Sequence, residues 1–327
     1  MRSNPSIQEC IFQFYMDHQV PEAYGGRVDH LLLNREIWVN PKVGSQVDGK
    51  LALIRDIPDY LAFESKRPVG TRTIRIPQYR GYLVDLRGYP HIDDFLRAQL
   101  SRRNIKNLHS KQRGLEKLGK VEYRTLSGPL GEERYARAFE TFYSLLKKRF
   151  DSKKIWNRDL AQWEDLYRQA LPRLLGNQAV LFQIVLEGRP ICMALDYIME
   201  NSAFSHIQTY DMAFSKYNLG DINMLFQLQW CLDHGISIFD MSKGKNPYKE
   251  KWCNHSYRFH HEISYGPGRG QWRAKWTALG YTGIQKLREL GILGNLVHVD
   301  KWLYRLRKNR LRNEIHLKSA PYDSHAR

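Results

Sequence analysis

The feature that most restricts the fold of this chain is a strand–helix–strand pattern over residues 202–241. Residues 202–211 (SAFSHIQTYD) have the length and composition of a strand, and residues 236–241 (ISIFDM) are a short apolar run typical of a buried parallel strand. Residues 216–235 (KYNLGDINMLFQLQWCLDHG) open with turn-forming residues, continue at helical spacing and stop at a glycine. A crossover of about 25 residues that contains a helix joins parallel strands of one sheet. The pattern therefore predicts an α/β fold with a ligand site at the carboxyl ends of these strands.

The start of this helix is suited to binding an anion. Asn218 and Gly220 are the residue types that most readily adopt positive φ, so the backbone can turn and present N–H groups ahead of the helix. The helix dipole favours an anion there by about 0.3–1 kcal/mol. Asp221 is the expected N-cap. Two interpretations stay open, a phosphate cradle and an ordinary strand-to-helix turn.

Further strands and helices are expected on both sides of this unit. The expected strands lie within residues 28–39, 50–57, 71–76, 81–86 and 202–211 and in a hairpin at 179–199 that turns at Glu187-Gly188. The expected helices are residues 93–118, capped by Asp93, then about 133–150 and 159–176. Residues 126–133 resemble a linker. We therefore expect an N-terminal half at residues 1–125, a second half at 126–265 and a basic tail at 266–327.

The charge of the chain limits its partners. With 51 Lys and Arg against 34 Asp and Glu, the net charge is +17, which indicates RNA, an anionic membrane surface or a phosphorylated substrate. No apolar run approaches the roughly 20 residues that span a bilayer, and the N-terminus lacks a signal-peptide core. The four cysteines show no paired spacing. We expect a cytoplasmic protein without disulfides and, since no Cys-x-x-Cys pair exists, without a metal site.

The segment FDMSKGKNPYKEKW (residues 239–252) follows the strand–helix–strand unit and carries five residues in a distinctive order. They are Asp240, Gly244, Tyr248, Lys249 and Trp252. With Tyr210-Asp211 ahead of the glycine-opened helix, the chain resembles the GNAT superfamily of acyltransferases, in particular its CelD-type branch, which is related to the FemAB peptidoglycan enzymes. The resemblance implies mixed twisted sheets with flanking helices in two GNAT-like halves, of which the second is the better supported, plus a basic helical tail.

The resemblance also implies a donor, acyl-coenzyme A, with acetyl as the expected acyl group. In GNAT folds the strands on either side of the phosphate-binding helix are parallel but splay apart, and the pantetheine arm lies between them. The implied donor-binding residues are Tyr210, Ser215, Lys216, Asn218, Leu219, Gly220 and Asp221. The wider superfamily has Gln or Arg at the position of Ser215, Gly at Asn218, and Gly or Ala at Gly220.

Four residues are candidates for catalysis, each with a structural alternative. Asp240 is the first candidate for the base, because burial raises the pKa of a carboxyl group; alternatively it caps the next turn. Tyr248 could protonate the leaving thiolate or fill the loop as an aromatic plug. Lys249 could hold an oxyanion or a phosphate, or be a solvated charge. His206, in the middle of a strand, is a candidate base or a structural histidine.

The expected activity is transfer of an acyl group to an amine or hydroxyl, with a cell-envelope sugar or polysaccharide precursor as a candidate acceptor. One alternative is a FemAB-like enzyme that uses aminoacyl-tRNA, bound by the basic residues 102–120 and the tail. Another is a non-catalytic module that docks on a membrane or on RNA. Residues 296–312 combine an apolar and a basic helical face, which suits either an anionic membrane surface, on the inner face of the membrane, or packing on the domain.

Overall fold

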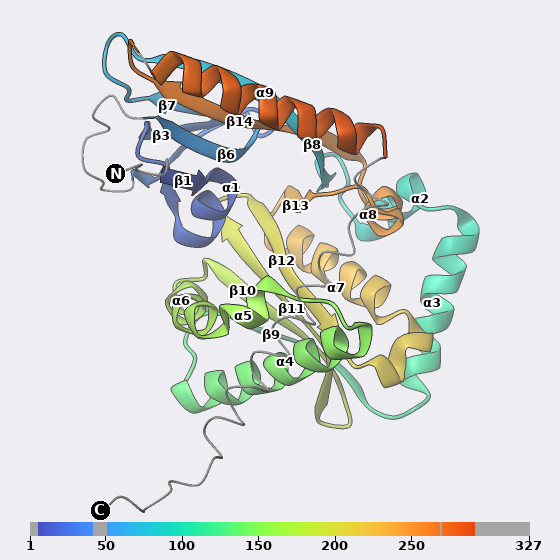
Figure 1. The fold of residues 1–327 in the computed structure, drawn as a ribbon. Coiled ribbons are helices and arrows are strands. Elements are labelled where there is room, and N and C mark those ends of the chain that lie inside the picture. The colour runs from blue at the N-terminus through green and yellow to red at the C-terminus, as the bar shows by residue number, and fades with distance from the viewer. Residues whose placement is uncertain (1–5, 42–50, 269, 292–327) are drawn as a thin grey trace, which may run out of the picture.

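A nine-stranded mixed sheet forms the centre of the computed structural model, which describes residues 6–41, 51–268 and 270–291 (Figure 1). In sheet order the strands are β1 (Ser6–Glu9), β6 (Ala52–Pro58), β14 (His255–Tyr265), β8 (Arg72–Asp85), β13 (Ile238–Lys243), β12 (Ser202–Tyr210), β11 (Arg189–Met199), β10 (Ala179–Leu186) and β9 (Val121–Leu126). Two small sheets add β2 (Gln19–Val20) with β5 (Asn40–Pro41), and β4 (Arg35–Trp38), β3 (Tyr24–His30) and β7 (Leu61–Ser65). The expected mixed α/β fold is confirmed.

Helices cover both faces of the sheet. They are α1 (Cys10–Phe12), α2 (Ile92–Gln99), α3 (Arg102–Glu116), α4 (Glu132–Lys153), α5 (Arg158–Ala161), α6 (Trp163–Leu175), α7 (Leu219–Asp233), α8 (Pro247–Trp252) and α9 (Gly270–Glu289). Every residue of β10 is buried. Leu181 packs in the core with α4 and α6, whereas Val180 and Phe182 pack against Phe226 and Trp230 of α7. Because successive strand residues point to opposite faces, α4 and α6 lie on one side and α7 on the other.

The sheet joins the two expected halves through β8 and β13, which pair antiparallel with Ile238 opposite Asp85. β14 pairs with β6 and β8, strands of the N-terminal part of the chain. β9 pairs with β10 of the following part. The domain boundaries near residues 125 and 265 stay a prediction, and each of them lies at a strand that pairs with the neighbouring half.

Several local predictions are confirmed and others are wrong. The hairpin at 179–199 forms β10 and β11, with positive φ at Glu187 and Gly188 as a tight turn requires. The expected helix at 93–118 is broken at Leu100, which is extended, because Ser101 accepts the Asn104 N–H and caps α3. His91, rather than Asp93, is the N-cap of α2.

The remaining differences concern strand lengths and the tail. The expected strands at 71–76 and 81–86 form one strand, β8, and residues 28–39 contain the turn between β3 and β4. The expected helix at 296–312 lies outside the described residues. Within the part of the chain that the structure describes, none of the helices combines the length and apolarity of a membrane span.

Candidate functional site

β12 and β13 separate partway along their length, at the point where the sequence predicts a ligand site. The parallel pairs are Ser202 with Ile238, Ala203 with Phe239 and Phe204 with Asp240. β12 then continues to Tyr210 without a further β13 partner in the described ladder. Its pairing with β11 shifts register at His206, which is the extra residue of a bulge. Since a bulge bends and twists a strand, it is the local cause of the separation.

A cavity of about 610 Å³ lies beyond this separation. It is open to solvent, and its walls are the end of β12, the start of α7, the C-terminal part of α4 and α8. Its lining residues are Arg149, Gln208, Tyr210, Ser215, Asn218, Leu219, Gly220, Asp221, Asn246, Pro247 and Tyr248. The structure thus brings together every predicted donor-binding residue except Lys216, which is exposed with its Nζ over the ring of Tyr217.

The backbone at the start of α7 has the geometry that the sequence predicts for Asn218. This residue has φ 52° and ψ 48°, in the left-handed region, and it is the N-cap of α7. Its carbonyl accepts the N–H groups of Asp221 and Ile222. The N–H groups of Leu219 and Gly220, at the first two helical positions, have no acceptor within the helix. Both residues line the cavity, so an anion there would meet two N–H groups.

Gly220 provides room rather than an unusual φ. A Cβ at this position would lie 3.8 Å from the Gln208 Nε2 and 3.8 Å from a ring carbon of Tyr248. These distances are ordinary van der Waals contacts, so alanine fits and a large side chain would fill the cavity. The carbonyl of Gly220 accepts the Tyr248 hydroxyl at 2.8 Å and the Gln208 side-chain amide at 3.3 Å.

The prediction that Asp221 is the N-cap is wrong. The left-handed turn at Asn218 starts the helix earlier, so Asp221 is its third residue. Its carboxylate accepts the Lys251 ammonium at 2.5 Å and the Trp252 indole N–H at 2.9 Å. Asp221 therefore connects the first turn of α7 to α8, which forms the opposite wall of the cavity.

Arg149 is a cavity residue that sequence reasoning missed. From α4 it donates to the carbonyl of Gln208 at 2.8 Å, and its guanidinium lies 4.4 Å from the ring centre of Tyr210. It supplies a positive charge beside the start of α7, where Ser215 supplies none. The basic end of the helix, KKR at 147–149, is visible in the sequence. The sequence does not show which of these cations faces the cavity.

Asp240 occupies the last paired position before the two strands separate. It is fully buried and accepts hydrogen bonds from the hydroxyls of Tyr60 and Tyr257 and from the Ser242 N–H. Burial raises its pKa from 3.8 to about 6, although these hydrogen bonds oppose the shift. The Ser242 N–H that Asp240 accepts belongs to β13 itself, at the register shift between Asp240 and Lys243, so Asp240 holds an irregularity within the strand rather than a turn after it. It has the raised pKa expected of a base. It does not line the 610 Å³ cavity.

Tyr248 and Lys249 both hold backbone carbonyls. Tyr248 donates to Gly220 and lines the cavity, and burial raises the pKa of its hydroxyl well above the usual value. Lys249 donates from Nζ to the carbonyls of Ser242 and Lys243 at the end of β13. Burial lowers its pKa, while nearby Asp240 opposes that shift. Both side chains are half-buried and fix the backbone around the separation.

His206 lies apart from the cavity residues. Its Nε2 is 3.7 Å from the Asp159 Oδ1, and its ring contacts Phe12 and Tyr197. Burial lowers its pKa to about 4, so it is neutral at physiological pH. Among the described residues, no group of three His, Cys, Asp or Glu side chains is placed to hold a metal ion.

Comparison with known proteins assigns this region to a family. A model of the acetyltransferase (GNAT) domain matches residues 101–250, and no curated protein matches the chain. Similar solved structures include FemX (12% identity, 70% of this chain and 74% of that chain covered, TM-score 0.48) and L-PGS from Bacillus licheniformis (14%, 72% and 73%, 0.42). A tandem GNAT protein from the clavulanic acid biosynthesis pathway is also similar (11%, 67% and 65%, 0.35). The family match identifies a GNAT acetyltransferase domain at residues 101–250, in agreement with the sequence motifs.

Proposed function

We propose that this protein transfers an acyl group, with acetyl as the expected one, from acyl-coenzyme A to an amine or hydroxyl. The main support for this proposal is the 610 Å³ cavity beyond the separated strands, because the start of α7 and Arg149 both line it. A cell-envelope sugar or polysaccharide precursor is the candidate acceptor by family analogy alone.

The residues present fit the diphosphate of such a donor. The N–H groups of Leu219 and Gly220 and the charge of Arg149 would hold it, with the hydroxyl of Ser215 as a further donor. The edge of β12 beyond Phe204 is free of β13 and offers backbone groups to an extended arm. When bound, the co-substrate supplies an activated thioester carbonyl.

Asp240 is the proposed base of this reaction. Its carboxyl lies where the two strands part, and its raised pKa suits it to accept a proton near neutral pH. Because it is buried behind the hydroxyls of Tyr60 and Tyr257, one of these hydroxyls would pass the acceptor's proton to it. Tyr248, a cavity residue, is the proposed acid for the leaving thiolate. Lys249 is a positioning residue for the end of β13.

Calorimetry with acetyl-coenzyme A tests the donor site. We expect the parent protein to bind and Gly220→Trp to lose at least 100-fold in affinity, because the indole would occupy the space in front of the α7 N–H groups. Gly220→Ala is the matched control and should bind within a few-fold of the parent. If the parent does not bind, the donor assignment fails, and salt-dependent binding of charged tRNA becomes the measurement of choice.

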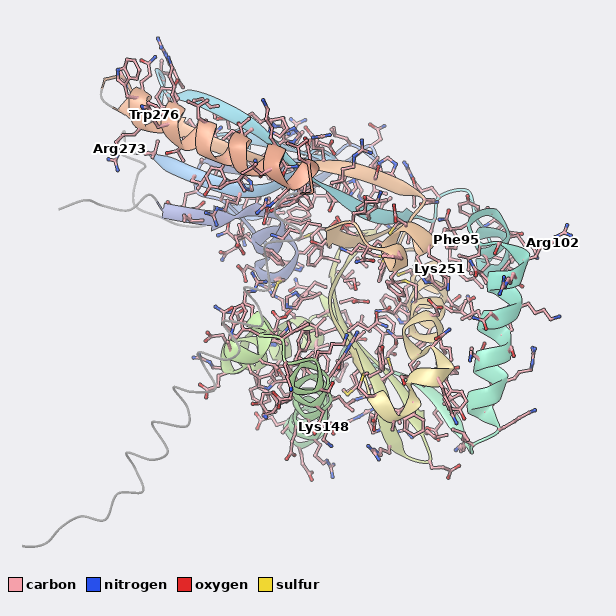
Figure 2. All side chains as sticks on the ribbon, turned by 45° about the vertical axis from the view of Figure 1, so that its right-hand side comes forward. Phe95, Arg102, Lys148, Lys251, Arg273 and Trp276 are labelled. Atoms are coloured by element: carbon pink, nitrogen blue, oxygen red, sulfur yellow. The ribbon has the colours of Figure 1, made fainter. Side chains whose placement is uncertain are left out.

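Arg149→Ala is expected to weaken acetyl-coenzyme A binding by about 10- to 100-fold, the range of a hydrogen bond to a charged group. Lys148→Ala removes a cation from the adjacent residue of α4, which is exposed and does not line the cavity (Figure 2). This control should bind like the parent. Equal losses in the two variants would show that only the overall charge matters.

A further inference from the structure

The helix α9 has two apolar faces. Its inner face is narrow: Ala274 and Ala278 are buried against Leu53 and Ile263 of the sheet. On its outer side, Trp272 and Trp276 are each 70% exposed and Leu279 is 61% exposed. Figure 2 shows Trp276 and Arg273 on the outside of the molecule, at the end of α9. The two alanines and Tyr281 thus face the protein, while both tryptophans face away from it.

These exposed side chains form one stripe, which we call the outer stripe. Its members are Trp272, Trp276, Leu279, Leu287 and Leu290. Their spacings of four, three, eight and three residues keep them on one side of a helix, opposite the two buried alanines. Exposed apolar side chains gathered on one side of a helix, here densest at Trp272, Trp276 and Leu279, are typical of an interaction site in a folded protein.

Positive charges border the outer stripe. By helical position, Lys275 and Lys286 lie on one side of the stripe and Arg273 on the other, whereas Arg288 lies over the ring of Tyr79 on β8. The one carboxylate of α9 is Glu289, its last residue. Lys275 places its Nζ 5.7 Å from the ring centre of Trp272. At the start of the helix, the neighbouring loop after β7 carries Val69, which is fully exposed. Tryptophan flanked by lysine and arginine is the composition of helices that lie at a lipid headgroup layer.

Three partners could cover the outer stripe: a second copy of the chain, residues 292–327 or a lipid surface. The positive charge beside the stripe distinguishes between them. A second copy of the chain, related by a twofold axis, would place the cations Arg273, Lys275 and Lys286 against the same three of its partner. The chain's own residues 292–327 carry 8 Lys and Arg against 3 Asp and Glu, a net charge of +5, and would also be repelled. An anionic lipid surface matches both the apolar stripe and its cationic borders.

We propose that α9 docks this protein on an anionic membrane surface, with Trp272 and Trp276 inserted among the lipid headgroups. The surface belongs to the end of the sheet that contains β8 and β14, whereas the donor cavity lies at β12 and α7 (Figure 1). The proposal goes beyond acyl transfer and does not depend on it.

Co-sedimentation with vesicles tests the proposal. We use the full chain with vesicles of phosphatidylcholine, alone or with a third of the lipid replaced by phosphatidylglycerol. The parent should bind only the anionic vesicles, and added salt should weaken binding because it screens the cationic borders. Trp272→Ser with Trp276→Ser should lower the binding at least 10-fold. The same variant should keep the parent's affinity for acetyl-coenzyme A, which separates this surface from the donor site.

Trp38→Ser is the matched control, because Trp38 is 72% exposed but lies on β4, outside α9. It should bind anionic vesicles like the parent. The proposal is overturned if the parent does not bind anionic vesicles, or if the double variant binds them as the parent does. It is also overturned if sedimentation velocity shows a dimer that the double variant abolishes, since a second copy would then cover the stripe.

Discussion

The variant Asp240→Asn is expected to lower acyl-transfer turnover by about 100- to 10,000-fold, which is the range of general base catalysis. Its affinity for acetyl-coenzyme A should stay nearly unchanged. The carboxyl of Asp240 has a pKa of about 6 and does not line the donor cavity. In the parent, turnover should therefore rise with pH through about 6 as the carboxyl loses its proton. The measurement is thiol release from acetyl-coenzyme A with a panel of amine and hydroxyl acceptors.

Asp196→Asn is the matched control for this variant. Asp196 is also fully buried in the GNAT domain, where the Gln227 amide donates to it, but it lies on β11 and does not line the cavity. It should keep its turnover. Comparable losses in both variants, or full turnover in Asp240→Asn, would exclude Asp240 as the base.

Stability gives a second readout for Asp240. The pKa of Asp240 is about 6 in the folded protein and 3.8, the ordinary value of an aspartate, in the unfolded chain. The folded protein therefore holds this proton more tightly than the unfolded chain. Its contribution is fully present below about pH 4 and is lost as the pH rises through about 6, on the order of 3 kcal/mol in total. Other groups, such as His206, also titrate in this range, so the measurement is the difference between the two proteins. In urea unfolding, the parent should lose this amount of stability relative to Asp240→Asn between pH 4 and 8.

Trp252→Ala is expected to lower the free energy of unfolding by about 3–5 kcal/mol. Trp252 is fully buried between α7 and the N-terminal part of the sheet, and its indole N–H donates to Asp221. The change leaves a cavity and removes one of the contacts that hold α8 against the start of α7. Affinity for acetyl-coenzyme A should fall as well, because α8 lines the donor cavity.

Trp276→Ala serves as the control, because this tryptophan is mostly exposed. It should change the free energy of unfolding by no more than about 0.5 kcal/mol. Urea unfolding of both variants at one pH makes the comparison. A similar small effect in both would mean that Trp252 is not part of a tightly packed core.

The sequence predicts the local parts of the site well. The strand–helix–strand unit, the hairpin and the left-handed Asn218 follow from residue types at fixed spacing, and the structure has all three. Arg149 and Tyr60 come from segments far away in the chain, and Tyr257 comes from another strand, β14. Their contacts depend on how the sheet is assembled, which no local pattern encodes.

The same difference between local and distant information explains the wrong predictions. The apolar spacing of residues 93–118 continues across the break between α2 and α3, since both helices face the same core. The break depends on the competition between one more helical turn and the cap at Ser101. Asp221 is a good capping residue, but its carboxylate is used by Lys251 and Trp252 instead.

The position of β14 has a consequence for synthesis on the ribosome. This strand, residues 255–265, lies between β6 and β8, which are made some 170 to 200 residues earlier. Until it emerges, both older strands keep an open hydrogen-bonding edge in the nascent chain. The N-terminal part of the sheet is therefore completed late, and until then its unpaired strand edges can pair with other chains.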